Sequence, residues 1–521
     1  MTETFKDYRF MADPIREHAR LRGGKPALIF QDRTTSYAEL DERASRVANG
    51  LIDEGVGYQG RVAILSRNVD YFFEIYYGAT KAGAVLVPVN FRLAPPEVAY
   101  VVNDAEAEVL FVGPDYYDLV RSIAGELDTV RRIVALEDGA PEWDSYTAWR
   151  QAGAADDPHR ERDPSDTAIQ VYSSGTTGHP KGVELMHRNF LFMLPKVLED
   201  WGVWDEHDVS MVAMPLFHVS GCQWGFVAFY VGGTNVLMAD VDPPAILKAI
   251  ERYRITQTIF VPAVILFLLH TPGVEDTDFS SVKQVVYGAS PIPLPVLKQA
   301  VETFGCGFAQ VYGLTETTGG ITYLPPEDHD GSERMKSCGK PMRTAEIRVV
   351  DAEGEDCPPG EVGEIVVAGN QIMKGYWHLP EETAKAIDGR WFHSGDAGYF
   401  DAEGYLYIYD RVKDMIVSGG ENVYPAEVES ALAAHPKIAD VAVIGVPDER
   451  WGEAVKAVVV AKPGEALSEQ EVIAFARKNI AGYKCPKSVD FTDTLPRNPS
   501  GKILKRELRK PYWEGQERQV H

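Results

Sequence analysis

Residues 171–182, Val-Tyr-Ser-Ser-Gly-Thr-Thr-Gly-His-Pro-Lys-Gly, carry the side chains best suited to phosphate chemistry. Glycines let backbone N–H groups gather around an anion, and the Ser and Thr hydroxyls add donors to phosphate oxygens. The Walker pattern is not met, because Lys181 lies three residues beyond Gly178 and is followed by Gly182 instead of Ser or Thr. The flanking residues 169–171 and 183–185 have extended character. We therefore predict a phosphate loop between two strands; a simple surface turn is the alternative interpretation.

Composition limits the classes of partner. The 521 residues correspond to roughly three domain-sized units, and the formal charge of −25 argues against nucleic acid or an anionic membrane. Five scattered cysteines without a C-x-x-C pair indicate a reducing compartment. The most apolar run, residues 259–269, is too short to span a bilayer. We expect a soluble cytoplasmic protein with no signal peptide, no nucleic-acid partner and no integral membrane association.

The elements that must position the loop follow an α/β pattern. Residues 36–57 and 71–82 have helical periodicity, and residues 61–65 and 84–89 read as buried strands. Residues 55–60 match G-x-G-x-x-G, but they follow a helix and open a strand, so we reject a dinucleotide site there. A polar linker at 154–166 precedes the loop, and a second α/β run covers about 209–323.

The C-terminal part has a different pattern. Short strands with glycine turns at about 337–410 indicate a small β-subdomain. Beyond residue 410, a helix at 427–435, strands at 441–445 and 455–460, and a capping box at 468–471 suffice for a further domain. We predict an α/β fold: a large N-terminal domain, residues 1–410, with two α/β subdomains and the β-subdomain, and a small mobile α+β domain, residues 411–521.

Seven stretches, taken in order, resemble the AMP-forming acyl-CoA synthetases of the adenylating-enzyme superfamily. They are residues 173–182, Pro-Leu-Phe-His at 215–218, Tyr-Gly-Ala-Ser-Pro at 287–291, Gln-Val-Tyr-Gly-Leu-Thr-Glu-Thr at 310–317, Phe-His-Ser-Gly-Asp at 392–396, Asp-Arg-Val-Lys-Asp at 410–414 with Gly-Gly-Glu-Asn at 419–422, and Pro-Ser-Gly-Lys at 499–502. The resemblance implies that a carboxylic acid and ATP give an acyl-adenylate and pyrophosphate, and that coenzyme A then takes the acyl group. It also implies Mg²⁺ as cofactor and, because many relatives self-associate, a homodimer.

The resemblance assigns catalytic roles to four residues. Lys502 would contact the carboxylate and the α-phosphate; at about 4 Å and an effective dielectric near 20, one such charge contributes roughly 4 kcal/mol. Glu316 and Thr177 would hold Mg²⁺, which lowers repulsion between phosphates. His218 would lie beside the reacting carboxylate. Solvated-lysine, helix-cap and structural-histidine interpretations of Lys502, Glu316 and His218 stay open.

For the nucleotide, the resemblance implies that adenine lies between the Gly288–Ala289 backbone and the ring of Tyr312. Asp396 would accept the ribose hydroxyls, with Arg411 near the ribose or phosphate. The full implied set of nucleotide-binding residues is Ser173, Ser174, Gly175, Thr176, Thr177, Gly178, Lys181, Gly288, Ala289, Ser290, Gln310, Tyr312, Gly313, Thr315, Asp396, Ile408, Arg411 and Lys502.

The resemblance further implies a change of domain orientation between the two half-reactions. Lys413 would be the hinge. One orientation would present Lys502, and the other would present Gly419 and Gly420, which would line the channel for coenzyme A; closure also shields the adenylate from water.

The acid is less defined. The expected acyl pocket combines His218, Val219, Gly221, Trp224, Tyr287, Gly313, Gly319 and Gly320. The glycines leave room and the remaining side chains are mostly apolar, which suits a fatty or an aryl tail. The sequence as a whole resembles bacterial medium- or long-chain fatty acyl ligases more than plant-type coumarate ligases. The resemblance therefore implies a medium- or long-chain fatty acid, with an aryl or cinnamate-type acid as the alternative. His218 occupies the position where amino-acid adenylation domains carry an acidic residue, which argues against an amino-acid substrate. An inactive nucleotide- or acyl-binding homologue is the other alternative, and joint retention of Lys502, Glu316, Asp396 and Arg411 argues against it.

Overall fold

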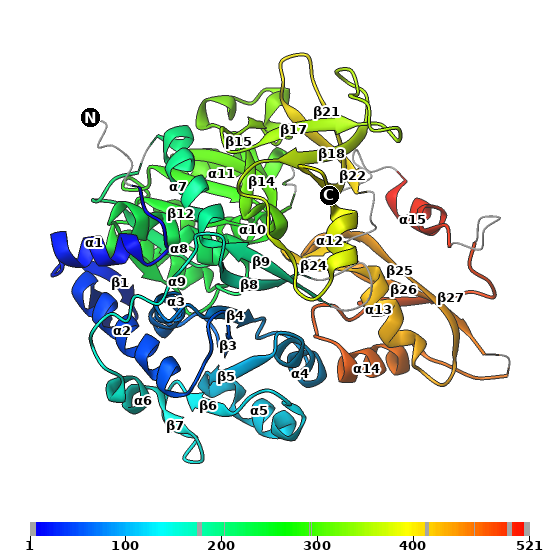
Figure 1. The fold of residues 1–521 in the computed structure, drawn as a ribbon. Coiled ribbons are helices and arrows are strands. Elements are labelled where there is room, and N and C mark those ends of the chain that lie inside the picture. The colour runs from blue at the N-terminus through cyan, green and yellow to red at the C-terminus, as the bar shows by residue number, and fades with distance from the viewer. Residues whose placement is uncertain are drawn as a thin grey trace.

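The computed structural model describes residues 7–173, 180–202, 204–290, 292, 294–411, 416–462, 464–496 and 503–514. Three sheets make up the larger N-terminal part, and a fourth forms a smaller C-terminal domain (Figure 1). The α/β class, the β-subdomain and the small C-terminal domain predicted from the sequence are confirmed.

The first sheet has eight strands in the order β19-β9-β8-β4-β3-β5-β6-β7. The strands β3 to β8 run parallel, and β9 pairs antiparallel with β8, so residues 174–179 join two strands of one hairpin as predicted. The strand bounds are β3 Arg61–Leu65, β4 Val85–Val89, β5 Ala107–Val112, β6 Arg132–Ala135, β7 Asp144–Ser145, β8 Thr167–Ser173, β9 Lys181–Met186 and β19 Gly375–Tyr376. Its helices are α2 Tyr37–Asp53, α3 Tyr71–Lys81, α4 Pro95–Asp104, α5 Tyr117–Ile123 and α6 Tyr146–Ala152.

Local sequence explains where these helices begin. The Ser36 hydroxyl accepts the Glu39 backbone N–H, and the Glu39 carboxylate accepts the Ser36 backbone N–H at 2.8 Å, which is a capping box at the start of α2. At α4, the Glu97 carboxylate accepts the Ala94 backbone N–H at 2.8 Å. Both acidic side chains satisfy backbone donors that a helix leaves unpaired.

The second sheet has nine strands in the order β16-β15-β14-β13-β12-β10-β11-β1-β2. Its N-terminal hairpin β1–β2 joins the edge far from β16 in the sheet. The strand bounds are β1 Pro26–Phe30, β2 Arg33–Ser36, β10 Val209–Val212, β11 Thr234–Leu237, β12 Gln257–Phe260, β13 Gln284–Gly288, β14 Gly307–Leu314, β15 Gly319–Leu324 and β16 Lys340–Pro341. The helices are α1 Asp13–Arg22, α7 His187–Trp201, α8 Val219–Val231, α9 Pro243–Tyr253, α10 Pro262–Leu269 and α11 Leu294–Phe304.

An aromatic layer joins the two large sheets. Phe73 and Tyr76 of α3 contact Phe226 and Phe229 of α8, with ring centroids 4.5 to 6.3 Å apart. Gly225 is required at the centre of this contact, because a Cβ there would lie 2.6 Å from the Phe73 ring. Close packing of such large rings holds the two subdomains as one body.

The β-subdomain is antiparallel, with strands β17 Glu346–Val350, β18 Gly363–Ala368, β20 Ile387–Asp388, β21 Trp391–Phe400 and β22 Leu406–Arg411, and helix α12 Pro380–Ala386 beside it. The C-terminal domain contains β23 Ile416–Ser418, β24 Glu421–Val423, β25 Ile438–Asp448, β26 Gly452–Ala461 and β27 Ser488–Phe491, with helices α13 Pro425–Ala433, α14 Glu469–Asn479 and α15 Lys505–Trp513. It has an apolar core of its own and lies against the N-terminal part (Figure 1).

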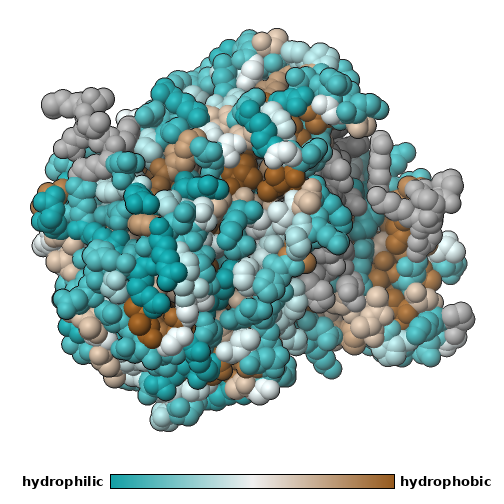
Figure 2. All heavy atoms as spheres, viewed as in Figure 1, coloured by the Kyte–Doolittle hydropathy of each residue, from teal (hydrophilic) through white to brown (hydrophobic). Residues whose placement is uncertain are grey.

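The surface agrees with the strongly acidic composition. The face in Figure 2 is mostly hydrophilic, and apolar residues appear on it in separate patches. Among the helices that the structure describes, none is long and apolar enough to cross a bilayer. All five cysteines are free thiols.

Candidate active site

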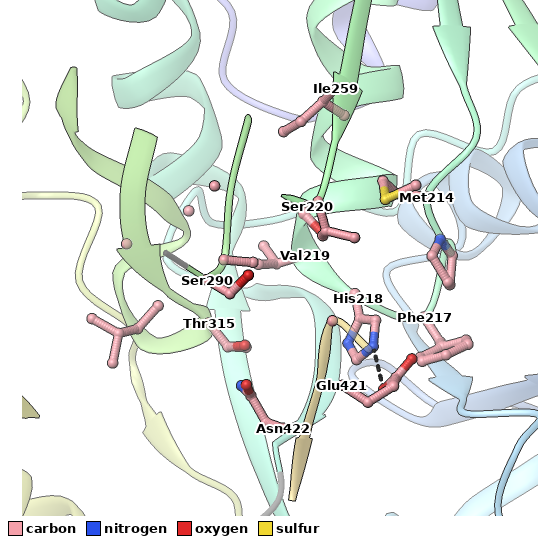
Figure 3. Close-up of a pocket in the computed structure, with 18 of the residues that line it drawn as sticks. Met214, Phe217, His218, Val219, Ser220, Ile259, Ser290, Thr315, Glu421 and Asn422 are labelled. Atoms are coloured by element: carbon pink, nitrogen blue, oxygen red, sulfur yellow. Dashed lines mark hydrogen bonds and ion pairs between the residues drawn. The ribbon is translucent and has the colours of Figure 1, made fainter. Parts of the chain in front are cut away.

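A cavity of about 710 Å³ lies where the carboxyl ends of β13 and β14, the start of α8 and the C-terminal domain meet. This edge of a parallel sheet is where α/β folds bind their ligands. Figure 3 shows His218, Ser290, Thr315 and Glu421 around the cavity. The lining therefore includes residues from all the expected subsites: nucleotide, acid and thiol.

On the nucleotide side, the central contact joins Tyr312 of β14 to Asp396 of β21. The Tyr312 hydroxyl donates to Asp396 Oδ2 at 2.7 Å, and Asp396 is 4% exposed. Ala289 has a left-handed backbone with φ +68°, and a Cβ at Gly288 would collide with the Val311 carbonyl. Bare backbone at Gly288 and the Tyr312 ring therefore line the same cavity, and a flat base needs both kinds of surface.

Glu316 lies at the phosphate side of the cavity. Tyr376 of β19 donates its hydroxyl to Glu316 Oε1 at 2.9 Å, and burial together with this carboxylate raises the Tyr376 pKa. A carboxylate supplies the oxygen ligands that Mg²⁺ prefers, so Glu316 fits a Mg²⁺ ligand.

On the acid side, Gly313, Gly319 and Gly320 of β14 and β15 present bare backbone to the cavity. A Cβ on Gly313 would collide with the Gly319 carbonyl, and one on Gly319 with the Gln223 side chain, whereas one on Gly320 would make an ordinary contact of 3.6 Å with Met342 Sδ. We call these three residues the glycine shelf. Apolar side chains complete the subsite: Val197, Trp201, Val219, Trp224, Val227 and Met342.

His218 links this subsite to the C-terminal domain. Burial and the Arg92 guanidinium lower the His218 pKa to about 3, so the imidazole is neutral near pH 7. Its Nε2–H donates to Glu421 Oε2 at 3.1 Å (Figure 3), and Glu421 Oε1 pairs with Arg92. Glu421 of β24 is thus held by two groups of the N-terminal domain.

Gly419 and Gly420 also line the cavity. Both have positive φ, +61° and +85°. A Cβ at Gly420 would lie 3.0 Å from Val261 Cγ2, and one at Gly419 would lie 2.6 Å from the Trp451 ring. Side chains at either position would therefore both strain the backbone and narrow the passage.

Three expected site residues lie elsewhere. Tyr287 is fully buried in the core, with its hydroxyl 3.0 Å from His329 Nε2, because alternate residues of a strand face opposite sides of the sheet. Gly221 packs against the Pro215 carbonyl, where a Cβ would not fit. Lys181 Nζ forms an ion pair with Glu382 at 2.7 Å, beneath the hairpin rather than in the cavity.

The other described residues of the expected nucleotide and acid sets line the cavity: Ser173, Gly288, Ala289, Ser290, Gln310, Tyr312, Gly313, Thr315, Glu316, Asp396, Ile408, His218, Val219, Trp224, Gly319 and Gly320. Ser174, Gly175, Thr176, Thr177, Gly178, Lys413 and Lys502 lie outside the described residues. For Arg411 the backbone is described, and it pairs with Asp396 between β22 and β21.

Four residues that line the cavity were not predicted from the sequence: Arg92, Glu421, Trp451 and Tyr483. Tyr376, which donates to Glu316, was not predicted either. A carboxylate directly after two glycines was a usable signal for Glu421. The others are single residues in ordinary surroundings, and only the folded chain brings them to the site.

Comparisons with known proteins agree with this geometry. A model of the AMP-binding enzyme family matches residues 15–377, and a model of the AMP-binding enzyme C-terminal domain matches residues 427–502. The chain is 39% identical over 510 residues, 97% of its length and 96% of the relative's, to the fatty acid–[acyl-carrier-protein] ligase ScoC of Streptomyces coeruleorubidus. It is 39% identical to feruloyl-CoA synthase of an Amycolatopsis species over 504 residues, 96% of this chain and 98% of that protein.

Two structures of one enzyme, o-succinylbenzoate CoA synthetase (MenE) of Bacillus subtilis, match this chain to different extents. A double mutant bound to its product analogue OSB-NCoA matches with TM-score 0.85, 30% identity, and coverage of 95% of this chain and 97% of that one. The complex with the acyl-adenylate intermediate OSB-AMP matches with TM-score 0.69, 31% identity and the same coverage. Since the enzyme and the coverage are the same, the higher score shows that this chain as a whole superposes better on the product-analogue complex.

Proposed function

Since the chain belongs to the AMP-binding enzyme family and is an AMP-forming acyl- or aryl-CoA ligase, we propose that its acid is a fatty acid of medium or long chain. The observation that supports this choice is the apolar subsite beyond the glycine shelf, bounded by Trp201, Trp224 and Met342. One cavity of about 710 Å³ must take the adenylate, the acid and the thiol arm together, which favours a moderate tail.

An aryl acid is the second candidate. Trp201 and Trp224 both line the subsite, with ring centroids 5.7 Å apart, and indole faces bind planar rings well. The glycine shelf lines the same cavity. The feruloyl-CoA synthase relative supports the same alternative.

In the proposed adenylation step, the chain must bring two anions together. As the resemblance implies, residues 173–178 would contact the phosphates, and Lys181 of β9 donates to Glu382 Oε2 at 2.7 Å. Tyr312 stacks on adenine, Asp396 accepts the ribose hydroxyls with Arg411 nearby, and Lys502 balances charge between carboxylate and α-phosphate. Bound Mg²⁺, held by Glu316 with Thr177, would neutralise phosphate charge and ease departure of pyrophosphate.

For the second step we propose a boundary between domains 1–410 and 411–521 with Lys413 as the hinge. Coenzyme A enters past Gly419 and Gly420. Neither glycine has a side chain, and this leaves room for the narrow pantetheine arm. Neutral His218, oriented by Glu421, lies beside the acyl carbonyl. The free thiols support a reducing, cytoplasmic setting; a homodimer is proposed from the family alone.

The test is pyrophosphate release with ATP and Mg²⁺ across fatty acids of increasing length and aryl acids, with and without coenzyme A. We expect release with medium-chain fatty acids and thioester formation only when the thiol is present. Preference for aryl acids would replace the first candidate by the second. Silence across the panel while ATP still binds would refute both.

A further inference from the structure

A short segment of the C-terminal domain, residues 481–485, is inserted into the N-terminal domain. Ala481 is 2% exposed and belongs to the apolar cluster that includes Leu93 and Val101. Asn90 Nδ2 donates to the Tyr483 hydroxyl at 3.2 Å. The segment therefore makes both apolar and polar contacts across the domain boundary. The residue that follows Tyr483 is Lys484.

Lys484 is buried between two carboxylates from the two domains. Its side chain is 1% exposed, and Nζ lies 2.7 Å from Glu97 Oε1 of α4 and 2.6 Å from Glu427 Oε1 of α13. The other Glu97 oxygen accepts the Ala94 backbone N–H, so this carboxylate is fixed at the start of α4. Burial alone would lower the Lys484 pKa, yet the two carboxylates raise it, so the ammonium stays charged.

The charge balance makes this bridge specific to one domain orientation. Glu427 and Lys484 belong to the same domain and stay together when it turns, whereas Glu97 belongs to the other domain. Removing the lysine would leave two carboxylates facing each other in a buried place, which is strongly unfavourable. The bridge therefore stabilises the orientation seen here and contributes nothing to one that separates Lys484 from Glu97.

We propose that Lys484 is a positioning residue for thioester formation, which holds the C-terminal domain in the orientation of the second half-reaction by bridging Glu97 and Glu427. The better superposition on the product-analogue complex, and the place of Gly419, Gly420 and Glu421 in the cavity, point to that orientation. The inference rests on the proposed two-step function.

Lys484→Met tests the proposal, with Lys456→Met as the matched control. Lys456 is also a buried lysine of the C-terminal domain, but its partner Asp490, at 2.7 Å, lies in the same domain. Adenylation is measured by acid-dependent exchange of pyrophosphate into ATP, and the second step by single-turnover transfer from preformed acyl-adenylate to coenzyme A. We expect Lys484→Met to slow transfer by about 10-fold or more with exchange unchanged, and Lys456→Met to leave the ratio of the two rates unchanged.

Substitutions of Glu97 and Glu427 test which of the two ion pairs joins the domains. Glu97→Gln can still accept the Ala94 N–H but loses the charge across the boundary, so it should slow transfer as well. Glu427→Gln keeps the bridge between domains and should slow transfer less than Glu97→Gln. Hydrogen exchange of residues 94–104 and 480–487 should accelerate in Lys484→Met and stay unchanged in Lys456→Met.

Equal slowing of both half-reactions in Lys484→Met, or unimpaired transfer with unchanged hydrogen exchange, would overturn the proposal. The wild-type protein tests the underlying function separately: exchange without any thioester would refute the second half-reaction itself. In that case hydrogen exchange still decides whether Lys484 holds the domains together.

Discussion

Asp396→Asn is the sharpest test of the nucleotide subsite, because it removes a charge without changing the shape of the side chain. Asp396 is 4% exposed, and its Oδ2 already accepts the Tyr312 hydroxyl at 2.7 Å. The amide can keep one acceptor, but it presents an N–H₂ donor where the carboxylate presented a second acceptor. One ribose hydroxyl therefore loses a charge-assisted hydrogen bond.

Such a bond contributes about 1.5–3 kcal/mol. At about 1.4 kcal/mol for each factor of ten, kcat/KM for ATP should fall about 10- to 100-fold. Tyr312→Phe is the matched comparison, since it removes only the hydroxyl that holds Asp396 and leaves the ring for adenine. Its loss should be smaller, because the carboxylate and its charge remain.

The assay compares ATP with 2′,3′-dideoxy-ATP in acid-dependent pyrophosphate release. The wild-type protein should strongly prefer ATP, whereas Asp396→Asn should lose most of that preference and Tyr312→Phe should keep it. If Asp396→Asn slows both nucleotides by the same factor, the side chain does not contact the ribose, and the assignment is refuted.

Three further substitutions probe other parts of the chain. Lys502→Ala should retain ATP binding yet lose adenylation by about 10²–10³-fold, measured by pyrophosphate exchange, because one stabilising charge is gone; an equal rate would contradict the role. Gly420→Ala should slow thioester formation but not adenylation in single-turnover assays, since the new Cβ would lie 3.0 Å from Val261 Cγ2 at φ +85°. Burial lowers the His187 pKa from 6.5 to about 4. Between about pH 6.5 and pH 4 the unfolded chain therefore binds more protons than the folded chain. The stability from neutral His187 is fully present above about pH 6.5. It is lost as the pH falls toward 4, by up to about 3 kcal/mol in the free energy of unfolding. Urea unfolding across this range should show the loss, and His187→Gln should flatten it; an identical slope in the variant would contradict the reasoning.

The sequence predicted the features that depend on neighbours along the chain. The predicted capping box at Ser468 begins α14, and the strands flanking residues 174–179 form a hairpin. Gly288, Gly313, Gly319 and Gly420 all line the cavity, as predicted. Their positions could be predicted because a close approach of backbone requires glycine, and the residue type is visible in the sequence.

Features that depend on distant partners were not predictable in the same way. Lys181 carries the same charge whether it contacts a phosphate or Glu382, and only the placement of α12 decides between them. Tyr287 follows strand alternation into the core, a choice of face that its short motif does not reveal. Lys484 and Glu97 are 387 residues apart, and their contact exists only where two domains meet.

The glycine shelf also limits how this enzyme could acquire new substrates. At Gly313 and Gly319 any side chain would strike backbone or the Gln223 amide, so mutation there damages the fold before it reshapes the subsite. Gly320 is different, because a methyl group there would meet Met342 and Val311 only at ordinary contact distances. Substrate size can therefore drift, or be engineered, through one permissive position, and Gly320 is the first residue to vary in a library that seeks shorter acids.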